Sequence, residues 1–433
     1  MELIMKRKKI AALLLAIVCT AGMIAGCGEA EGEKAPEQAE LSSEEPITLT
    51  FLRAGTDEAT QKAYEELIAA YEKEHPNITI EYQQVNFGTD LETKLNTLYA
   101  GGSAPDLVRA PISTIALRAS MGQYAALDEF IEGWPEKDNY MENAYEIGSY
   151  QGKQYGLPIV IDAQVFFYRK DYFEEAGLDP DSPPETWEEL LEYAEKLTVW
   201  EGNDVVRAGF AFPISGEHQT LIPFARQNGS LVVDEENNKP TFNDDKTIET
   251  LEYLAKYGEK NLVIPYIRNK DQNPFLLGNA AMTYAGVGNY TALKADGVEW
   301  IDQLGFSCGV GREKISTFGG AQIMFISEES KHKEEAWKFM EYLFADESVG
   351  KLIEETGATA VKLSLSEKYI ETYPEIGPAF LETLSHTQGM PKVEWAPAFE
   401  EAIKLAFEEA MYGKKDAKTA LDDAYNQLLS EIE

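Results

Sequence analysis

The sequence predicts an α/β protein of two domains in which helices cover parallel sheets, and two observations support this prediction. From Ile47 onward, short β-rich runs alternate with segments whose apolar residues recur at helical spacing. Repeated strand–helix units of this kind build parallel sheets. The length of 433 residues favours two domains rather than one.

The alternation is clear in the first part of the chain. Strands are expected at 47–52 and 78–85, with a helix at 58–74 between them. The apolar face of that helix is formed by Ala63, Tyr64, Leu67, Ile68 and Tyr71. A second helix is expected near 90–100 and a short strand at Leu107 and Val108.

The longest β-rich apolar run covers residues 157–168, and we expect the chain to pass there from one half to the other. A single charge, Asp162, interrupts this run. Further on, Thr186 and Glu189 have the spacing of a capping box that starts a helix. An apolar stripe predicts one more helix from about 398 to 431.

The first 26 residues have the features of an export signal, because a basic run at 6–9 precedes the uncharged stretch from Ile10 to Ile24. The stretch ends in Ile24-Ala25-Gly26-Cys27, which resembles the bacterial lipobox, where the cysteine is lipidated and becomes the first mature residue. An uncleaved membrane anchor is the alternative, but this apolar stretch is shorter than the roughly 20 residues that span a bilayer. Residues 27–46 lack core-forming side chains and are expected to be a flexible tether.

Charge and cysteine content exclude several classes of protein. The formal net charge is −37, and the densest basic cluster lies in the leader, which argues against a nucleic-acid partner. The cysteines are Cys19, Cys27 and Cys308. Only Cys308 belongs to the predicted mature body, so no disulfide framework is expected.

The sequence contains no convincing catalytic or metal-binding pattern. Residues 305–309 (GFSCG) match the G-x-S-x-G pattern of a nucleophile elbow, but no helical periodicity follows the serine as an elbow requires. The histidines are isolated, and metal-ligand spacings, a P-loop and a dinucleotide fingerprint are missing. We therefore expect neither an enzyme nor a bound metal or cofactor.

Aromatic and polar residues fall together in predicted loops, at Asn86 and Phe87, at Trp395 and in a turn at 288–290. Aromatic rings cover the apolar faces of sugars, while carboxylates, amides and arginines bond to sugar hydroxyls. For any single aromatic residue, core packing is the alternative. That is the role expected for three other residues, Trp187, Trp200 and Trp337.

Several segments, in their order along the chain, resemble the family 1 extracellular solute-binding proteins, the group that includes maltose-binding protein. They include GGSAPDLV, QYGLPIVIDAQVFFYRKDYFEEAGL, PETWEELLEYAEKLT, FLLGNAAMTYAGVGNY and FGGAQIMFISEESKHKEEAWKFMEYL. With the segment that begins GTDEATQKAYEELIAAYEKEHP, they span nearly the whole predicted mature chain.

The resemblance implies an α/β fold of two lobes joined by a hinge, the type II periplasmic-binding-protein fold, with the ligand between the lobes. Lobe I would comprise residues 47–159 and 315–361, and lobe II residues 160–314 and 362–433. They would follow a signal peptide at 1–26 and a lipidated tether at 27–46.

The resemblance also implies ligand contacts at positions that match the family's pattern. Asp162 matches the acidic sugar ligand that follows the hinge strand. Thr56 and Asp57 match the loop after the first strand, and Glu217 and His218 fall in a later loop that contributes polar contacts.

Four further positions depart more from the family's pattern. Trp395 falls near the late aromatic residue that stacks on sugar, and Arg109 is expected to face the cleft, whereas Asp106 is expected to be a structural cap. Many relatives have a tryptophan in the turn at 288–290, where this chain has only Tyr290 for stacking.

The expected function is capture of a sugar or oligosaccharide by closure of the lobes, followed by delivery to the permease of an ABC importer. The protein would be a monomer, anchored by its lipid on the extracellular face of the cell membrane. Two alternatives of other classes stay open. One is a secreted glycoside-active enzyme, since this acidic chain always offers some pair of carboxylates, and the other is a surface protein that senses a ligand without transport.

Overall fold

The computed structural model describes residues 45–212, 216–264, 273–359 and 361–432, and the compact unit begins at Glu45. The predicted signal peptide, the lipidation site Cys27 and nearly all of the tether lie outside the described residues. In the described part of the chain, no helix combines the length and the apolar character needed to cross a bilayer.

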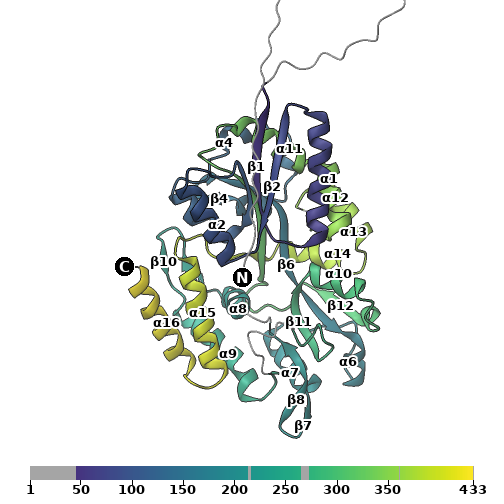
Figure 1. Ribbon diagram of the computed structural model, residues 1–433. Coiled ribbons are helices and arrows are strands. Elements are labelled where there is room, and N and C mark those ends of the chain that lie inside the picture. The colour runs from purple at the N-terminus through teal and green to yellow at the C-terminus, as the bar shows by residue number, and fades with distance from the viewer. Residues whose placement is uncertain (1–44, 213–215, 265–272, 360, 433) are drawn as a thin grey trace, which may run out of the picture. The chain divides into compact units, whose positions relative to one another are not determined.

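The first part of the chain forms a three-stranded parallel sheet with helices packed on it (Figure 1). Strand β1 pairs with β2 and with β3. The elements are β1 Ile47–Ala54, α1 Glu58–Glu74, β2 Ile78–Val85, α2 Thr89–Ala100, β3 Leu107–Pro111, η1 Ile112–Thr114, α3 Ile115–Ser120, α4 Asp128–Ile131, η2 Lys137–Asn139, α5 Glu142–Ile147, β4 Ser149–Tyr150 and β5 Lys153–Gln154. These elements, with α11 and α12 below, are called the first lobe.

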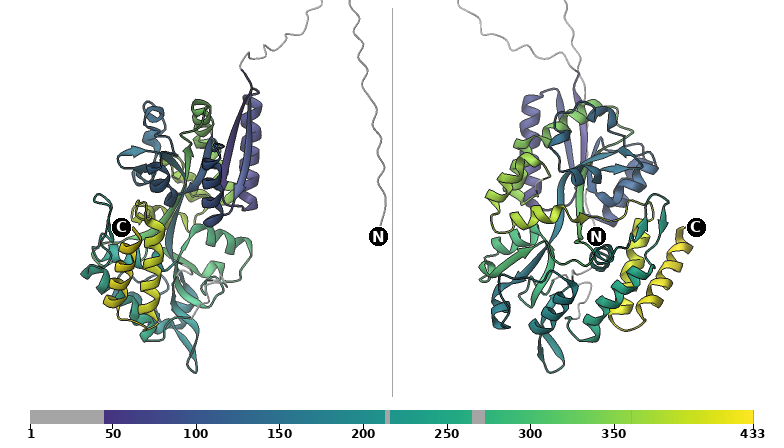
Figure 2. Two further views of the ribbon diagram at one scale, coloured as in Figure 1. Left: turned by 60° about the vertical axis from the view of Figure 1, so that its left-hand side comes forward. Right: turned by 180° about the vertical axis from the view of Figure 1, so that it is seen from behind.

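The second lobe is built around β8 and β11, which are parallel. Its elements up to β11 are α6 Lys170–Glu175, α7 Trp187–Leu197, β7 Val199–Glu201, β8 Asp204–Ala211, α8 Glu217–Gln227, β9 Val233–Asp234, β10 Lys239–Pro240, α9 Asp245–Glu259 and β11 Ala280–Gly286. The C-terminal helices α15 Ala396–Met411 and α16 Ala417–Ile432 pack side by side on α9 and complete this lobe (Figure 2).

Two long antiparallel strands join the lobes. Strand β6, Gly156–Arg169, pairs with β13, Thr317–Ile326, through residues 156–163 and then with β11 through residues 164–168. Strand β13 pairs with β3 at one end and with β14, Thr387–Gln388, at the other. The chain therefore crosses between the lobes along β6 and returns along β13.

The remaining elements lie beside these crossing strands or cover the first lobe. They are α10 Val287–Ala295, η3 Ile301–Gln303, β12 Leu304–Ser307, α11 Lys333–Phe344, α12 Asp346–Thr356, η4 Leu363–Leu365, α13 Ser366–Thr372 and α14 Gly377–Leu384. A third connection between the lobes lies near Thr359, whose hydroxyl donates to the carbonyl of Ile161 in β6.

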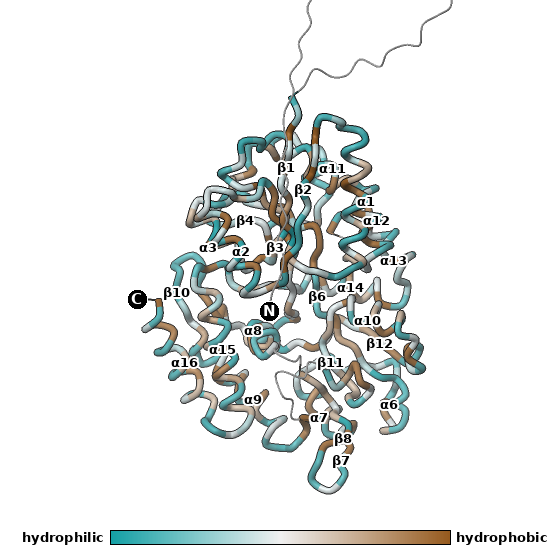
Figure 3. Tube along the Cα trace, viewed as in Figure 1, coloured by the Kyte–Doolittle hydropathy of each residue, from teal (hydrophilic) through white to brown (hydrophobic). Residues whose placement is uncertain are grey.

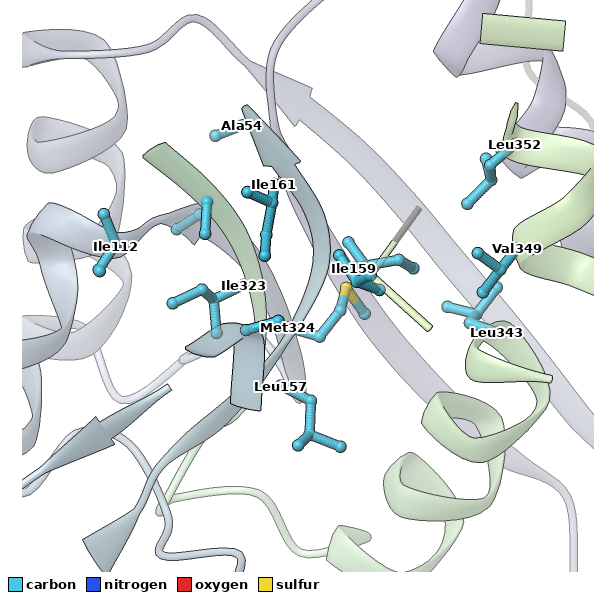
Figure 4. Close-up of a cluster of buried hydrophobic side chains, with 14 of the residues drawn as sticks. Ala54, Ile112, Leu157, Ile159, Ile161, Ile323, Met324, Leu343, Val349 and Leu352 are labelled. Atoms are coloured by element: carbon cyan, nitrogen blue, oxygen red, sulfur yellow. The ribbon is translucent and has the colours of Figure 1, made fainter. Parts of the chain in front are cut away.

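Buried apolar side chains form two cores, one centred on the first lobe and one in the second. The first gathers side chains of β1, β3, β6, β13, α11 and α12, among them Ile159, Ile323 and Leu343 (Figure 4). It also includes Tyr290 and Phe380, from α10 and α14. The second lies among α7, α8, α9, α15 and α16. Hydrophobic residues accordingly concentrate on the inner strands, and hydrophilic ones on the outer turns (Figure 3).

Several local predictions are confirmed. The 58–74 helix, the strand at 78–85 and the long strand around 157–168 are present. Thr186 and Glu189 form the predicted capping box at the start of α7. Asp106 is structural, because its carboxylate accepts from the backbone and hydroxyl of Thr50, both at 2.8 Å, and from the Ser330 hydroxyl at 2.6 Å.

Other predictions are wrong for identifiable reasons. The sheet is mixed rather than parallel, because both crossing strands run antiparallel to their neighbours. The predicted C-terminal helix is two helices, separated by a turn in which Gly413 has a φ of 63°. The expected turn at 288–290 lies inside α10. Trp200 is 41% exposed on the β7–β8 hairpin instead of packing in a core.

Ser307 is not part of a nucleophile elbow. It ends strand β12, and the next regular element is strand β13 rather than a helix. Its hydroxyl accepts from the backbone N–H of Gly309 at 3.2 Å. This context removes the one catalytic signature that the sequence contains.

Candidate functional site

Asp162 lies where β6 changes partner from β13 to β11. Its cross-strand neighbour is Gly320, where an added Cβ would meet no atom within 4 Å. At Gly286, by contrast, an added Cβ would come within 2.4 Å of the Asp162 carboxylate. Because Gly320 and Gly286 have no side chains, the Asp162 carboxylate has room on both sides and is exposed to solvent.

The electrostatic setting of Asp162 is unusual. The carboxylate reaches water but is enclosed by protein on most sides, and this desolvation raises its pKa to about 6. It accepts no hydrogen bond from any described residue, so its acceptor capacity is available to a ligand. A carboxylate without donors in a partly dry setting favours a ligand that supplies hydroxyl or amine protons.

Amide side chains lie beside this carboxylate. Gln164, two residues along β6 and on the same face, donates to the amide oxygen of Gln219 at 2.6 Å. Gln219 belongs to the first turn of α8. Asn289, in the first turn of α10, donates to the carbonyl of Gly286 at 3.4 Å. Neither glutamine was predicted as a ligand contact from the sequence. The alternation of strand residues nevertheless places Gln164 on the same face of β6 as Asp162.

A second group is formed by the loops after β1 and β2. The Thr56 hydroxyl donates to the side-chain oxygen of Asn86 at 3.0 Å, which ties the two loops together. Phe87 is 52% exposed, and its ring lies 3.1 Å from the position of a Cβ built on Gly55, whose φ is 102°. The ring thus covers the glycine and presents an exposed aromatic surface.

Asp57 and Arg53 brace this second group. Asp57 caps α1 by accepting from the backbone N–H of Thr60 at 2.8 Å, and it pairs with Arg53 at 3.0 Å. Partial burial works against ionisation, but the hydrogen bonds from Thr60 and Arg53 outweigh it and lower the pKa of Asp57. Asp57 therefore has a structural function, whatever else it contacts.

Arg109 is buried in the first lobe and is only 7% exposed. It lies beside Arg53 in the sheet, with its guanidinium carbon 5.5 Å from the centre of the Tyr64 ring. The guanidinium packs near the Tyr64 ring of α1, and its predicted place in the cleft stays a prediction.

The other predicted contacts lie in the second lobe or between the lobes. Glu217 and His218 are 2% and 5% exposed, and the His218 ring meets Phe318 edge-on at 5.4 Å. Burial lowers the pKa of His218, opposed by the nearby Glu400 carboxylate. Tyr290 is 2% exposed, which leaves little of its ring for stacking.

Trp395 is half-buried at the start of α15, and its indole N–H donates to the side-chain oxygen of Asn238 at 2.8 Å. Asn238 belongs to the turn between β9 and β10. One edge of the indole is therefore fixed by a protein partner.

Strand register relates the two exposed groups to each other. Arg53, Arg109, Met324 and Leu157 form one row across β1, β3, β13 and β6. Thr56 and Asp162 both lie beyond this row in the same direction, three strand spacings apart. At ~4.8 Å per spacing and ~3.3 Å per residue they are separated by roughly 15 Å along one edge of the sheet. An extended ligand could contact both groups.

The arrangement suits recognition rather than bond cleavage. It offers the open carboxylate of Asp162, several amides, a hydroxyl and an aromatic face, the combination that fixes a polar ligand with apolar faces. Among the described residues, no three His, Cys, Asp or Glu side chains gather as metal ligands would.

Fold and site together define a class, the α/β solute-binding protein with two lobes. The chain belongs to the bacterial extracellular solute-binding proteins, since the model of that family matches residues 55–349. It is 26% identical over 375 residues to the sn-glycerol-3-phosphate-binding periplasmic protein UgpB of Escherichia coli strain K12, covering 77% of this chain and 81% of UgpB. A putative binding protein of Brucella abortus strain 2308 is 25% identical, with 83% and 87% covered.

Solved structures show the same fold. CpMnBP1 with mannotriose bound is 26% identical, with a TM-score of 0.75 and coverage of 88% of this chain and 100% of that one. The sugar-binding protein MalE of Xanthomonas citri superposes with a TM-score of 0.77 at 20% identity, covering 89% and 98%. The predicted two-lobe periplasmic-binding-protein fold is confirmed.

The space around Asp162 can be tested with two neighbouring glycines. Gly286→Ala should lower the free energy of unfolding by up to about 1 kcal/mol relative to Gly288→Ala, because its methyl group would force the Asp162 carboxylate to turn aside. Gly288→Ala is the matched control, since its methyl group meets nothing within 4 Å. Urea unfolding of both variants measures the difference, and equal stabilities would show that the carboxylate does not occupy this space.

The raised pKa of Asp162 predicts a pH effect. The folded chain holds this proton more tightly than the unfolded chain, so the carboxyl's contribution to stability is largest at low pH and is lost as the pH rises from about 4 to about 6. Asp162→Asn should therefore be more stable than the wild type above pH 7, by about 1 kcal/mol after allowance for solvent screening. The gain should shrink towards about pH 4. Urea unfolding across this range checks the trend, and the opposite trend would contradict the raised pKa.

Proposed function

We propose that this chain is the extracellular binding component of an ABC importer and that its ligand is a sugar or oligosaccharide. The observation that carries the proposal is the Asp162 carboxylate, which stands open where β6 changes partner and accepts no hydrogen bond from the described residues. Sugar hydroxyls supply the missing donors, and the exposed Phe87 ring offers a face for the apolar side of a pyranose.

The comparisons support this ligand class. CpMnBP1 is described with mannotriose and with mannobiose bound. UgpB is named for a different polyol ligand, sn-glycerol 3-phosphate, so that compound belongs in any ligand screen. Both ligands carry several hydroxyl groups, the chemistry that an open carboxylate and neighbouring amides recognise.

In this proposal the ligand closes the two lobes around itself. The lobes are joined by the crossing strands β6 and β13 and by the segment around Thr359. A ligand that contacts both lobes binds the closed state better than the open state, and this difference in affinity shifts the population. The permease would recognise the closed shape, and no covalent step is needed.

The ligand-binding residues proposed from the resemblance are Thr56, Asp57, Asn86, Phe87, Arg109, Asp162, Glu217, His218, Tyr290 and Trp395. We propose the largest contributions from four exposed members, namely Asp162, Phe87 and Thr56 with Asn86, because the exposed Asp57 is already engaged by Thr60 and Arg53. Gln164 and Gln219 are added to the set because they lie beside Asp162.

Binding is tested by calorimetry against mono- and oligosaccharides and sn-glycerol 3-phosphate. Asp162→Ala should weaken sugar binding by about 1 to 3 kcal/mol through the lost hydrogen bonds, and Phe87→Ala by about 0.5 to 1.5 kcal/mol through the lost stacking face. Asp302→Ala, at an exposed position of η3, is the control.

Every sugar should be recovered unchanged after incubation. Release of shorter sugars would support a glycoside-active enzyme instead. A binding affinity that is unaltered by Asp162→Ala would remove that carboxylate from the site.

We also propose that Cys27 anchors the mature chain on the extracellular face of the cell membrane. The support is the order Ile24-Ala25-Gly26-Cys27 at the end of the apolar leader. Cys27→Ser should move the protein from the membrane fraction to the medium or the periplasm, because the thiol that carries the lipid is lost. Cys308→Ser is the control. Membrane retention of the Cys27→Ser protein after leader cleavage would contradict lipid anchoring.

A further inference from the structure

A cavity of about 590 Å³ lies between the two lobes. Ile112, Glu146 and Ile147 line it from the first lobe, and Arg226 and Glu235 from the second. Residues 314–316, 385–390 and 392 complete its wall. It is large enough for a small solute together with water.

Arg226 is a buried cation without a carboxylate partner. Its residue is 7% exposed, and its guanidinium donates through Nη1 to the carbonyls of Gln388 at 3.4 Å and Gly389 at 2.9 Å. The Glu235 carboxylate attracts it from beyond ion-pair distance, and Arg226 forms no direct ion pair with the described residues. Desolvation lowers the pKa of Arg226 to about 10, so the side chain stays charged at neutral pH. Buried charges are normally paired.

Ser316 provides an independent sign of a missing partner. The residue is 2% exposed and lines the same cavity, and its hydroxyl has no hydrogen-bond partner. Buried hydroxyls in folded proteins are nearly always hydrogen-bonded, so the Ser316 hydroxyl has an unused donor at the wall of this cavity.

Lys392 adds a third donor to the wall. Its ammonium donates to the carbonyl of Glu146 at 3.0 Å and to the Ser149 hydroxyl at 3.3 Å, and an ammonium carries three protons. The carboxylates of Glu146 and Glu235 also reach the wall, but both residues are exposed. Water screens their attraction for the buried guanidinium, so they do not replace a direct partner.

The cavity is separate from the group around Asp162. Ser316 lies four residues along β13 from Gly320, the neighbour of Asp162, or roughly 13 Å at ~3.3 Å per residue. Arg226 lies seven residues along α8 from Gln219, or roughly 10 Å at ~1.5 Å per residue. Helix α8, seen nearly along its axis in Figure 1, therefore begins beside the group around Asp162 and ends at the cavity.

We propose that this cavity binds a small oxyanion, such as phosphate, sulfate or the carboxylate of a small solute, through the Arg226 guanidinium, the Ser316 hydroxyl and the Lys392 ammonium. A planar guanidinium and a hydroxyl are donors that match the oxygens of such an anion. In a chain of net charge −37, this basic cavity is where an anion finds local compensation.

The test is calorimetric titration of the mature chain with inorganic phosphate, with sodium chloride at equal ionic strength as the reference. Wild-type protein should bind one phosphate saturably. Arg226→Met should weaken that binding at least tenfold, and Ser316→Ala several-fold. Arg207→Met is the matched control, because Arg207 already pairs with Glu175 at 2.7 Å outside the cavity, and it should leave phosphate binding unchanged.

Lys392→Gln and Ser316→Ala keep the proposal testable if Arg226→Met does not fold, since each should weaken phosphate binding in a folded protein. Parallel titrations with sulfate and malonate distinguish a tetrahedral anion from a carboxylate ligand. Phosphate heats equal to those of chloride would overturn the proposal, as would phosphate affinity that is the same in wild type, Ser316→Ala and Lys392→Gln.

Discussion

The pairing of β6 with β13 is the constraint on which the rest of the structure depends. These strands are long enough to belong to both lobes, and their antiparallel ladder turns two sheets into one continuous sheet. The ladder needs close packing at its start, where a Cβ on Gly156 would lie 2.5 Å from the Ile323 side chain. Strands β11, β8 and β7 continue the sheet from β6, so this ladder positions the sheet of the second lobe relative to that of the first.

The same ladder explains why a carboxylate can stand at the centre of an apolar strand. Asp162 occupies the residue at which β6 leaves β13 and joins β11, and neither neighbouring strand places a side chain over it. The surrounding protein encloses the Asp162 carboxylate but donates no hydrogen bond to it from the described residues. The resulting desolvation raises the pKa of the carboxyl, and its oxygens stay available to a ligand. An unsatisfied acceptor of this kind costs stability in the free protein, and a ligand with hydroxyl groups recovers that cost on binding.

Helix α8 links the two places where polar groups lack partners. Its first turn holds Gln219 beside Gln164, and its last turn holds Arg226 against the carbonyls of Gln388 and Gly389. A helix of a few turns moves as a rigid body, so a displacement of its first turn also displaces its last turn. The surroundings of the two ends differ in charge, since the first turn lies near the Asp162 carboxylate of β6 and the last turn carries the Arg226 guanidinium.

Local features of this protein were determined by the sequence alone. The α/β class, the capping box of Thr186 and Glu189 and the exceptional position of Asp162 depend on residues within a few turns or one strand of each other. Only the tertiary structure decided the mixed order of the sheet, the burial of Arg109, the exposure of Trp200 and the pairing of Gln164 with Gln219. The tertiary structure also decided that Arg226 and Ser316 line the same cavity. Such features depend on strands and helices distant in sequence, whose contacts are set by the packing of the whole chain and leave no local periodicity to read.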